Sequence, residues 1–181
     1  MEGKLIIVSG PSGSGKSTVT KMVKERLNIP LSISATTREP RIGEIDGKDY
    51  YFLSNEEFKK KIDNDEFYEY VNVHGNYYGT LKEVVDKELK KGFNVILEID
   101  VKGALIIKEK KKDSILVFFK TKNMEILEKR LRNRKTEKEE AIKIRLNNAL
   151  KELEYEEKYD YTIINEDIEK SCEELIEIIN R

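Results

Sequence analysis

The stretch Gly10-Pro11-Ser12-Gly13-Ser14-Gly15-Lys16-Ser17 (GPSGSGKS) determines how the rest of the chain is interpreted. It has the spacing G-x-x-x-x-G-K-S/T, follows the apolar segment Lys4–Ser9 and precedes a segment with helical spacing, which is the context this pattern requires. Its glycines let successive backbone N–H groups turn inward toward phosphate oxygens, and the following helix adds its positive N-terminal end. We therefore expect a loop that binds a nucleoside triphosphate used as a phosphoryl donor.

The last two residues of this stretch add specific chemistry. Lys16 places a mobile cation near the β- and γ-phosphates, and the Ser17 hydroxyl is a ligand for Mg²⁺. An ordinary glycine-rich turn between a strand and a helix has no need of either group. The pattern therefore favours a magnesium-bound triphosphate over a purely structural turn.

Around this loop, short apolar runs alternate with helical patterns, and most of the runs are β-branched or aromatic. Buried parallel strands have this composition, and the alternation predicts an open parallel sheet covered by helices on both faces. The predicted strands are Leu5–Val8, Leu31–Ile33, Val95–Ile99, Ile115–Phe119 and Thr162–Ile164, and the predicted helices are Ser17–Leu27, Val101–Lys111, Met124–Arg134, Glu137–Glu157 and Ile168–Ile179. The expected fold class is α/β, with a five-stranded parallel sheet of the P-loop NTPase type.

One stretch between the second and third predicted strands departs from this alternation. It contains several glycines and two short aromatic strands, Tyr50–Leu53 and Phe67–Val73. Between them, Ser54-Asn55-Glu56-Glu57 reads as a capping box that starts a helix. We expect a small mixed α/β insertion over the end of the main sheet. A second departure, Lys129–Glu140, is nearly all charged and is expected to be an exposed helix–turn–helix.

The composition limits the possible partners. The 181 residues suit a single domain, and 34 Lys and Arg against 35 Asp and Glu give a net charge of −1. General nucleic-acid and membrane binders need a basic excess, so we expect neither partner, and any bound anion must be held by a local cluster. The single cysteine, Cys172, allows no internal disulfide and suits a reducing cytoplasmic setting. The single histidine, His74, is not expected to form a catalytic or metal site alone.

A pair of arginines supplies the candidate cluster. Arg38 and Arg41 lie on a proline-containing loop just past the second predicted strand. Ligands of open α/β sheets bind off the carboxyl ends of the strands, so these arginines should face the phosphate loop. Their forked, permanently charged heads suit a second phosphate, although solvated surface arginines would satisfy the same pattern.

Several segments, in this order along the whole chain, resemble the guanylate kinase family. They are GPSGSGKST at Gly10–Thr18, SATTREPRIGEIDGKDYYF at Ser34–Phe52, EFYEY at Glu66–Tyr70, GNYYGT at Gly75–Thr80, LEIDVKGA at Leu97–Ala104 and RLRNRKTEKEEAIKIRL at Arg130–Leu146. The resemblance implies transfer of the γ-phosphoryl group of ATP to GMP, giving ADP and GDP, with Mg²⁺ bound to ATP. It also implies a cytoplasmic enzyme of purine metabolism that is a monomer or a homodimer.

The resemblance also implies a role for individual residues. The GMP phosphate would be held by Arg38, Arg41, Tyr50 and Tyr78, and the guanine base by Glu69, with Ser34, Thr80 and Asp100 completing the GMP site. ATP would be bound by residues 10–18, including Thr18, together with Arg130, Arg134 and Asn165. Lys16, Arg38, Arg134 and Arg145 would be catalytic, and Ser17 would bind the metal. A carboxylate suits the guanine edge, because that edge offers two donors that adenine lacks.

Two positions depart from the family pattern. Lys135 stands where a glycine usually follows the arginine of the charged segment, so the turn there is expected to differ. Val101 stands after Asp100, at a position that is often aromatic or hydrophobic in the family. The implied division is a core of residues 1–33, 82–124 and 148–181, a GMP-binding insertion of residues 34–81, and a helical lid of residues 125–147.

Three other readings remain open from the residues alone. Another nucleoside monophosphate kinase, or a transferase acting on a sugar phosphate, would keep the phosphate loop but not the set Ser34, Glu69 and Thr80. A guanylate-kinase-like module that binds phosphopeptides would keep Arg38 and Arg41 but lose the Lys16-Ser17 end of the loop. A GTPase switch would carry an N-K-x-D base motif, which the sequence lacks. The intact loop favours an enzyme.

Overall fold

The computed structural model describes residues 2–30, 32–73, 75–133 and 139–181, and it contains two four-stranded sheets. The main sheet is parallel, in the order β6-β1-β7-β8. Its strands are β6 (Val95–Glu98), β1 (Leu5–Ser9), β7 (Ile115–Lys120) and β8 (Tyr161–Ile164). Because the strands are parallel, their carboxyl ends meet at one edge, where Ser9, Glu98 and Asn165 lie.

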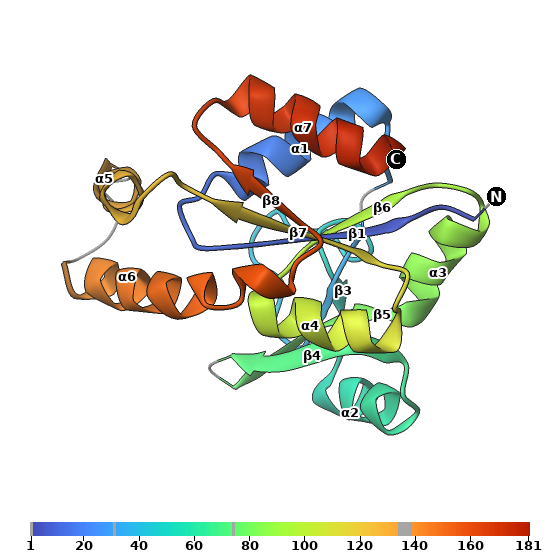
Figure 1. Ribbon diagram of the computed structural model, residues 1–181. Coiled ribbons are helices and arrows are strands. Elements are labelled where there is room, and N and C mark those ends of the chain that lie inside the picture. Colours follow the sequence, from blue (N-terminus) through green and yellow to red (C-terminus); the bar gives the residue numbers. More distant parts are fainter. Residues whose placement is uncertain (1, 31, 74, 134–138) are drawn as a thin grey trace.

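Helices cover both faces of this sheet, as the sequence predicts (Figure 1). Helices α1 (Lys16–Leu27) and α7 (Ile168–Asn180) pack on one face, in a core that includes Val19, Val23 and Leu175. Helices α3 (Lys82–Lys90) and α4 (Val101–Lys110) pack on the other. All residues of β1 are buried, as expected of a strand covered on both faces.

The prediction of a fifth parallel strand at Leu31–Ile33 is wrong. Leu31 lies outside the described residues, and residues 32–34 are assigned to no strand. Pro30 has no N–H to donate to a ladder, and the partly exposed segment after it leads into β2 (Ala35–Thr36), which pairs in the other sheet. The other four predicted strands and all five predicted helices are confirmed within a few residues, except that the fourth helix, α6, ends at Leu153.

The second sheet forms the insertion, in the order β3-β2-β5-β4. It consists of β3 (Tyr51–Phe52), β2, β5 (Asn76–Leu81) and β4 (Phe67–Val73). Helix α2 (Asn55–Asp63) begins at the predicted capping box, in which Ser54 and Glu57 bond each other's backbone N–H groups. Phe58 of α2 stacks on Phe67 and Tyr77, so these rings form the core of the insertion. Helix α4 lies between the two sheets and packs against β4 (Figure 1).

Two further helices project beyond the carboxyl edge of the main sheet (Figure 1). They are α5 (Met124–Asn133) and α6 (Glu139–Leu153), which pack through Leu127, Leu131, Ile142 and Ala149. A short 3-10 turn, η1 (Glu156–Lys158), returns the chain to β8. Residues 134–138, which include Arg134 and Lys135, lie outside the described residues, as does His74. None of the described helices combines the length and the apolar character needed to cross a membrane.

Candidate active site

The phosphate loop links the buried strand β1 to helix α1. Gly10, Gly13 and Gly15 have φ angles of 137°, 92° and 88°, a region that side chains other than glycine rarely adopt. A Cβ atom on Gly10 would lie 2.0 Å from the carbonyl oxygen of Phe119 in β7. The loop can therefore turn sharply over the sheet only because these positions are glycine.

Two residues distant in sequence hold the loop from outside. Asn165, at the end of β8, donates through Nδ2 to the carbonyl oxygen of Ser14 at 2.8 Å. Arg130 of α5 donates to the same oxygen at 3.3 Å and to the carbonyl oxygen of Asn165 at 2.8 Å. The structure thus brings two of the three sequence-predicted ATP residues outside the loop, Arg130 and Asn165, to the loop backbone, and the third, Arg134, lies outside the described residues.

Lys16 and Arg145 also lie at this loop. Lys16 is the first residue of α1, and its Nζ donates to the carbonyl oxygen of Pro11 at 3.4 Å, so its side chain folds back over the loop. Arg145 reaches from α6 to the Ser12 hydroxyl at 2.6 Å. Three elements outside the loop, α5, α6 and β8, therefore bring polar side chains to it.

Ser17 lies beside a carboxylate that sequence reasoning did not single out. The Ser17 hydroxyl donates to Oε1 of Glu98, the last residue of β6, and the Thr20 hydroxyl donates to Oε2 at 3.2 Å. A signal was available, because Glu98 lies at the carboxyl end of a predicted strand, two residues before Asp100. The loop thus has a hydroxyl and a carboxylate together, which are oxygen ligands suited to a hard divalent cation.

The two predicted phosphate-binding arginines lie on a turn of the insertion. Arg38 forms an ion pair with Glu44 at 2.9 Å, and the other Glu44 oxygen accepts from the backbone N–H of Arg41 at 2.7 Å. The bond to Arg38 lowers the pKa of the Glu44 carboxyl, and the Arg41 N–H lowers it further. Glu44 is a second residue that sequence reasoning missed, although it lies in one of the segments that carry the resemblance.

Two tyrosines complete this cluster. The Arg38 guanidinium lies 5.5 Å from the ring centre of Tyr50, and the Tyr50 and Tyr78 rings meet edge to face with centroids 6.2 Å apart. Tyr78 lies on β5 opposite Thr36, so the sheet fixes its position relative to the arginine turn. The structure therefore brings Arg38, Tyr50 and Tyr78 together, and Arg41 lies on the same turn as Arg38.

Glu69 is a buried carboxylate on β4 with one hydrogen-bonded partner on the neighbouring strand. It is 8% exposed, and its Oε1 accepts from the Thr80 hydroxyl at 2.7 Å. Burial raises the pKa of Glu69, the Thr80 hydrogen bond opposes that rise, and the negative charge of Asp100 adds to it. Such a carboxylate needs a donor to satisfy its remaining lone pairs.

A hollow of about 580 Å³ opens beside Glu69, between β4, α4 and α6. Asp100 also lines it and caps α4 by accepting from the N–H of Gly103 at 2.9 Å. Asn148 and Glu152 of α6 line the other side. Burial raises the pKa of Glu152, and the positive charge of Lys16 opposes this rise. Ser34 precedes β2 and accepts from the N–H of Tyr51 through its carbonyl.

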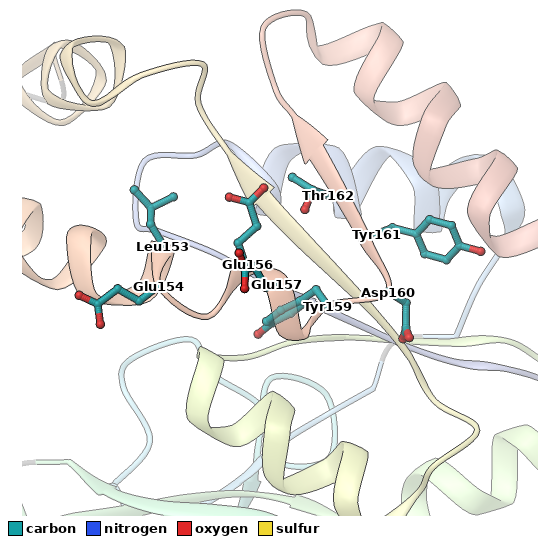
Figure 2. A pocket seen from close by; sticks show the side chains of 8 residues that line it. All are labelled: Leu153, Glu154, Glu156, Glu157, Tyr159, Asp160, Tyr161 and Thr162. Atoms are coloured by element: carbon teal, nitrogen blue, oxygen red, sulfur yellow. The ribbon is translucent and has the colours of Figure 1, made fainter.

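A second hollow, of about 560 Å³, lies near η1 and β8 and has a different character (Figure 2). Four carboxylates line it, Glu154, Glu156, Glu157 and Asp160. Glu156 is paired with Lys120 and Asp160 with Lys108. A wall with this charge repels phosphate groups, so we do not place a nucleotide there.

Comparisons with known proteins identify the family of the chain. The family model described as guanylate kinase matches residues 2–181. A guanylate kinase of Fusobacterium nucleatum is 62% identical, with 98% of this chain and 96% of the relative covered. A guanylate kinase of Caldanaerobacter subterraneus is 48% identical, with coverages of 98% and 87%.

Solved structures give the same answer for the fold. The crystal structure of a guanylate kinase from Anaplasma phagocytophilum superposes with a TM-score of 0.75 at 35% identity, covering 99% of this chain and 85% of the other. A shikimate kinase from Bacteroides thetaiotaomicron has a TM-score of 0.54 at 17% identity, covering 98% and 99%. The second likeness concerns the fold alone.

Proposed function

The chain belongs to the guanylate kinase family, and from this premise we propose how its residues divide the transfer of the γ-phosphoryl group of ATP to GMP. The products are ADP and GDP. The observation that carries the substrate assignment is the buried Glu69 carboxylate, which lines a hollow between β4, α4 and α6. A phosphate loop alone would leave the acceptor open.

On the donor side, residues 10–18 surround the triphosphate of ATP, and Lys16 neutralises its β- and γ-phosphates. Arg145 lies at the Ser12 end of the loop, in reach of charge that develops on the transferring group. Arg134 belongs, like Arg145, to the segment Arg130–Leu146 that carries the resemblance, and we propose a catalytic role for it as well. Arg130 and Asn165 complete the donor side through the loop backbone.

Ser17 and Glu98 fit the magnesium ion that accompanies ATP. The Ser17 hydroxyl donates a hydrogen bond to Glu98, so the lone pairs of the Ser17 oxygen remain available to a cation. Ser17 would hold Mg²⁺, and Glu98 would keep the hydroxyl in that orientation. The ion, when bound, neutralises phosphate charge.

On the acceptor side, Arg38 and Arg41 neutralise the phosphate of GMP, and Tyr50 and Tyr78 donate hydroxyl hydrogen bonds to it. Glu44 holds Arg38 and the Arg41 backbone in one turn before any substrate arrives. Because this turn is already ordered, less conformational entropy is lost when GMP binds.

The base of GMP is read by Glu69. Guanine presents N1–H and an exocyclic amine on one edge, and Glu69 accepts from both. Thr80 occupies Oε1 and so holds the carboxylate in place, while Ser34 and Asp100 complete the pocket. Adenine offers no such pair of donors, so AMP would leave a buried charge unpaired.

This chemistry needs no general base, because the acceptor oxygen of GMP is already anionic near neutral pH. The task is to bring two polyanions together and to stabilise the charge on the transferring group. We assign the core to residues 1–33, 82–124 and 148–181, the GMP-binding insertion to 34–81 and the lid to 125–147. Closure of lid and insertion would exclude water that otherwise hydrolyses ATP.

ADP release from ATP and Mg²⁺, measured with a panel of nucleoside monophosphates, tests this proposal. We expect turnover with GMP and at least about 10³-fold lower kcat/KM with AMP, because AMP leaves Glu69 without donors. Equal turnover with AMP and GMP would refute the role of Glu69. No turnover with any acceptor would instead favour a binding module. We place the enzyme in the cytoplasm, with ATP and GMP as its partners.

A further inference from the structure

Asn165 belongs to a polar network in the interior of the protein. The residue is 1% exposed and lies where the chain turns from β8 toward α7. Its Nδ2 donates to the carbonyl oxygen of Ser14 at 2.8 Å, and its Oδ1 accepts from the Ser171 hydroxyl at 3.0 Å. Because a carbonyl can only accept, these partners determine the orientation of the amide.

Ser171 extends this network into the core. It is 2% exposed and lies on α7 next to the buried Cys172. A hydroxyl at such a site is costly unless it is hydrogen-bonded, and its partner here is Asn165. Nothing in the local sequence distinguishes this serine from a small core residue, so only the structure connects it with the phosphate loop.

The network holds one peptide group of the loop, the one between Ser14 and Gly15, through its carbonyl oxygen. The carbonyl oxygen of Ser14 accepts from Asn165 and from Arg130 on the same outer side. In a trans peptide the C=O and N–H groups point in opposite directions, so the N–H of Gly15 is turned away from these donors, toward the inside of the loop. Inward N–H groups of this kind bind phosphate oxygens.

The close approach of Asn165 also explains why position 15 is glycine. A Cβ atom there would lie 2.2 Å from Nδ2 of Asn165. The glycine therefore provides space for the amide in addition to its φ angle of 88°.

We propose that Asn165 and Ser171 are positioning residues that hold the Ser14–Gly15 peptide in its phosphate-binding orientation. Asn165 then acts on the donor through the loop and not by contact with its base. A base contact would require the Asn165 side chain to leave Ser171 without its partner and the Ser14 carbonyl with only the longer bond from Arg130. This inference rests on the proposed function in one respect, the binding of a triphosphate by residues 10–18. The ligand that senses the network is the polyphosphate chain, whichever base it carries.

Inorganic tripolyphosphate, which has no base, is the probe that separates the two roles. The variants are Ser171→Ala and Asn165→Asp, and the second keeps the oxygen that accepts from Ser171 but loses the donor to Ser14. Ser114→Ala is the matched control, because Ser114 is 1% exposed at the opposite end of the sheet and its hydroxyl has no partner among the described residues. Calorimetry gives the Kd of tripolyphosphate and of GMP, and steady-state kinetics gives KM and kcat for ATP.

We expect Ser171→Ala to raise the tripolyphosphate Kd and the ATP KM by the same factor, about tenfold, since a buried acceptor loses its partner. Asn165→Asp should raise both further, because a carboxylate oxygen then faces the Ser14 carbonyl. The GMP Kd should stay within about twofold in each variant, which also shows that the protein is folded. Ser114→Ala should change none of these values.

Two results would overturn the inference. One is a raised ATP KM with an unchanged tripolyphosphate Kd, which would show that Asn165 reads the base. The other is Ser171→Ala and Asn165→Asp both behaving like Ser114→Ala. A wild-type protein without kinase activity would overturn the proposed function alone, because tripolyphosphate binding still tests the loop.

Discussion

Replacing Glu69 with glutamine keeps the size of the side chain and removes only its charge and half of its acceptor capacity. In the wild type, Oε1 accepts from Thr80 and the remaining lone pairs face the hollow that receives guanine. In Glu69→Gln, an NH₂ group replaces one oxygen. Guanine presents its two donors to the two carboxylate oxygens, so whichever way the amide turns, its NH₂ group faces one of these donors.

The size of the effect follows from that count. A hydrogen bond to a charged group contributes about 1.5–3 kcal/mol, and a buried donor left facing another donor costs about 1–3 kcal/mol. Their sum, about 3–6 kcal/mol, predicts that kcat/KM for GMP falls by about 10²- to 10⁴-fold. The KM for ATP should not change, because residues 10–18 lie outside this contact.

The assay is ADP release at saturating ATP with GMP varied, and Glu157→Gln, an exposed carboxylate on η1, is the matched control. A loss of less than about threefold for GMP, or equal losses for GMP and ATP, would refute the assignment of guanine to Glu69.

The raised pKa of Glu69 predicts that Glu69→Gln, which lowers activity, raises the stability of the fold. Because burial raises this pKa in the folded protein, the ionised carboxylate destabilises the fold at neutral pH. The folded wild type binds the proton more tightly than the unfolded chain, so its stability falls as pH rises through the raised pKa. Glu69→Gln should therefore melt at a higher temperature near pH 7, and the difference should vanish in acid. GMP binding by the wild type should weaken on acidification earlier than an ordinary carboxylate would allow.

Three further substitutions test other parts of the site. Lys16→Ala should lower kcat by about 10²-fold or more, since a fixed cation at the transferring group is lost, and a near-normal kcat would contradict its role. Gly15→Ala should melt at a lower temperature than Gly43→Ala, because both positions have φ near 90° but an added Cβ at Gly15 would lie 2.2 Å from Nδ2 of Asn165, whereas one at Gly43 would have nothing within 4 Å. Glu44→Gln should raise the KM for GMP without changing that for ATP, and equal changes in the two would show a general loss of structure.

The sequence predicts those parts of the molecule whose cause is local. The phosphate loop, the capping box at Ser54 and strand Phe67–Val73 all appear where pattern and spacing place them. The predicted strand at Leu31–Ile33 fails because an apolar run does not reveal its pairing partner, and the chain here continues to the insertion sheet. Strand β5 was not predicted because Gly79 and Asn76 resemble a turn. Gly79 is needed there, since a Cβ would lie 2.8 Å from the Phe67 ring.

The candidate site shows the same difference between features with a local cause and features that depend on tertiary contacts. Residues that touch nucleotides in the proposed mechanism belong to recognisable segments, so Glu69, Arg38 and Lys16 could be proposed from sequence. Residues that hold them in place carry no such signature. Ser171 lies 6 residues beyond its partner on another element and resembles any small core residue of a helix. Their roles arise from tertiary contacts, which a linear pattern does not encode.

Carboxylates within the site explain how a chain with a net charge of −1 forms a site for two polyanions. Glu44 holds Arg38, and Glu98 holds Ser17, so each group is oriented before a nucleotide binds. An unpaired arginine would instead sample many rotamers, and binding would have to order it. The Arg38 and Glu44 side chains are only 15% and 20% exposed, so bulk salt screens this pair less than a surface pair. The local positive field therefore comes from positioned cations with their own counterions, and a basic excess over the whole chain is not required.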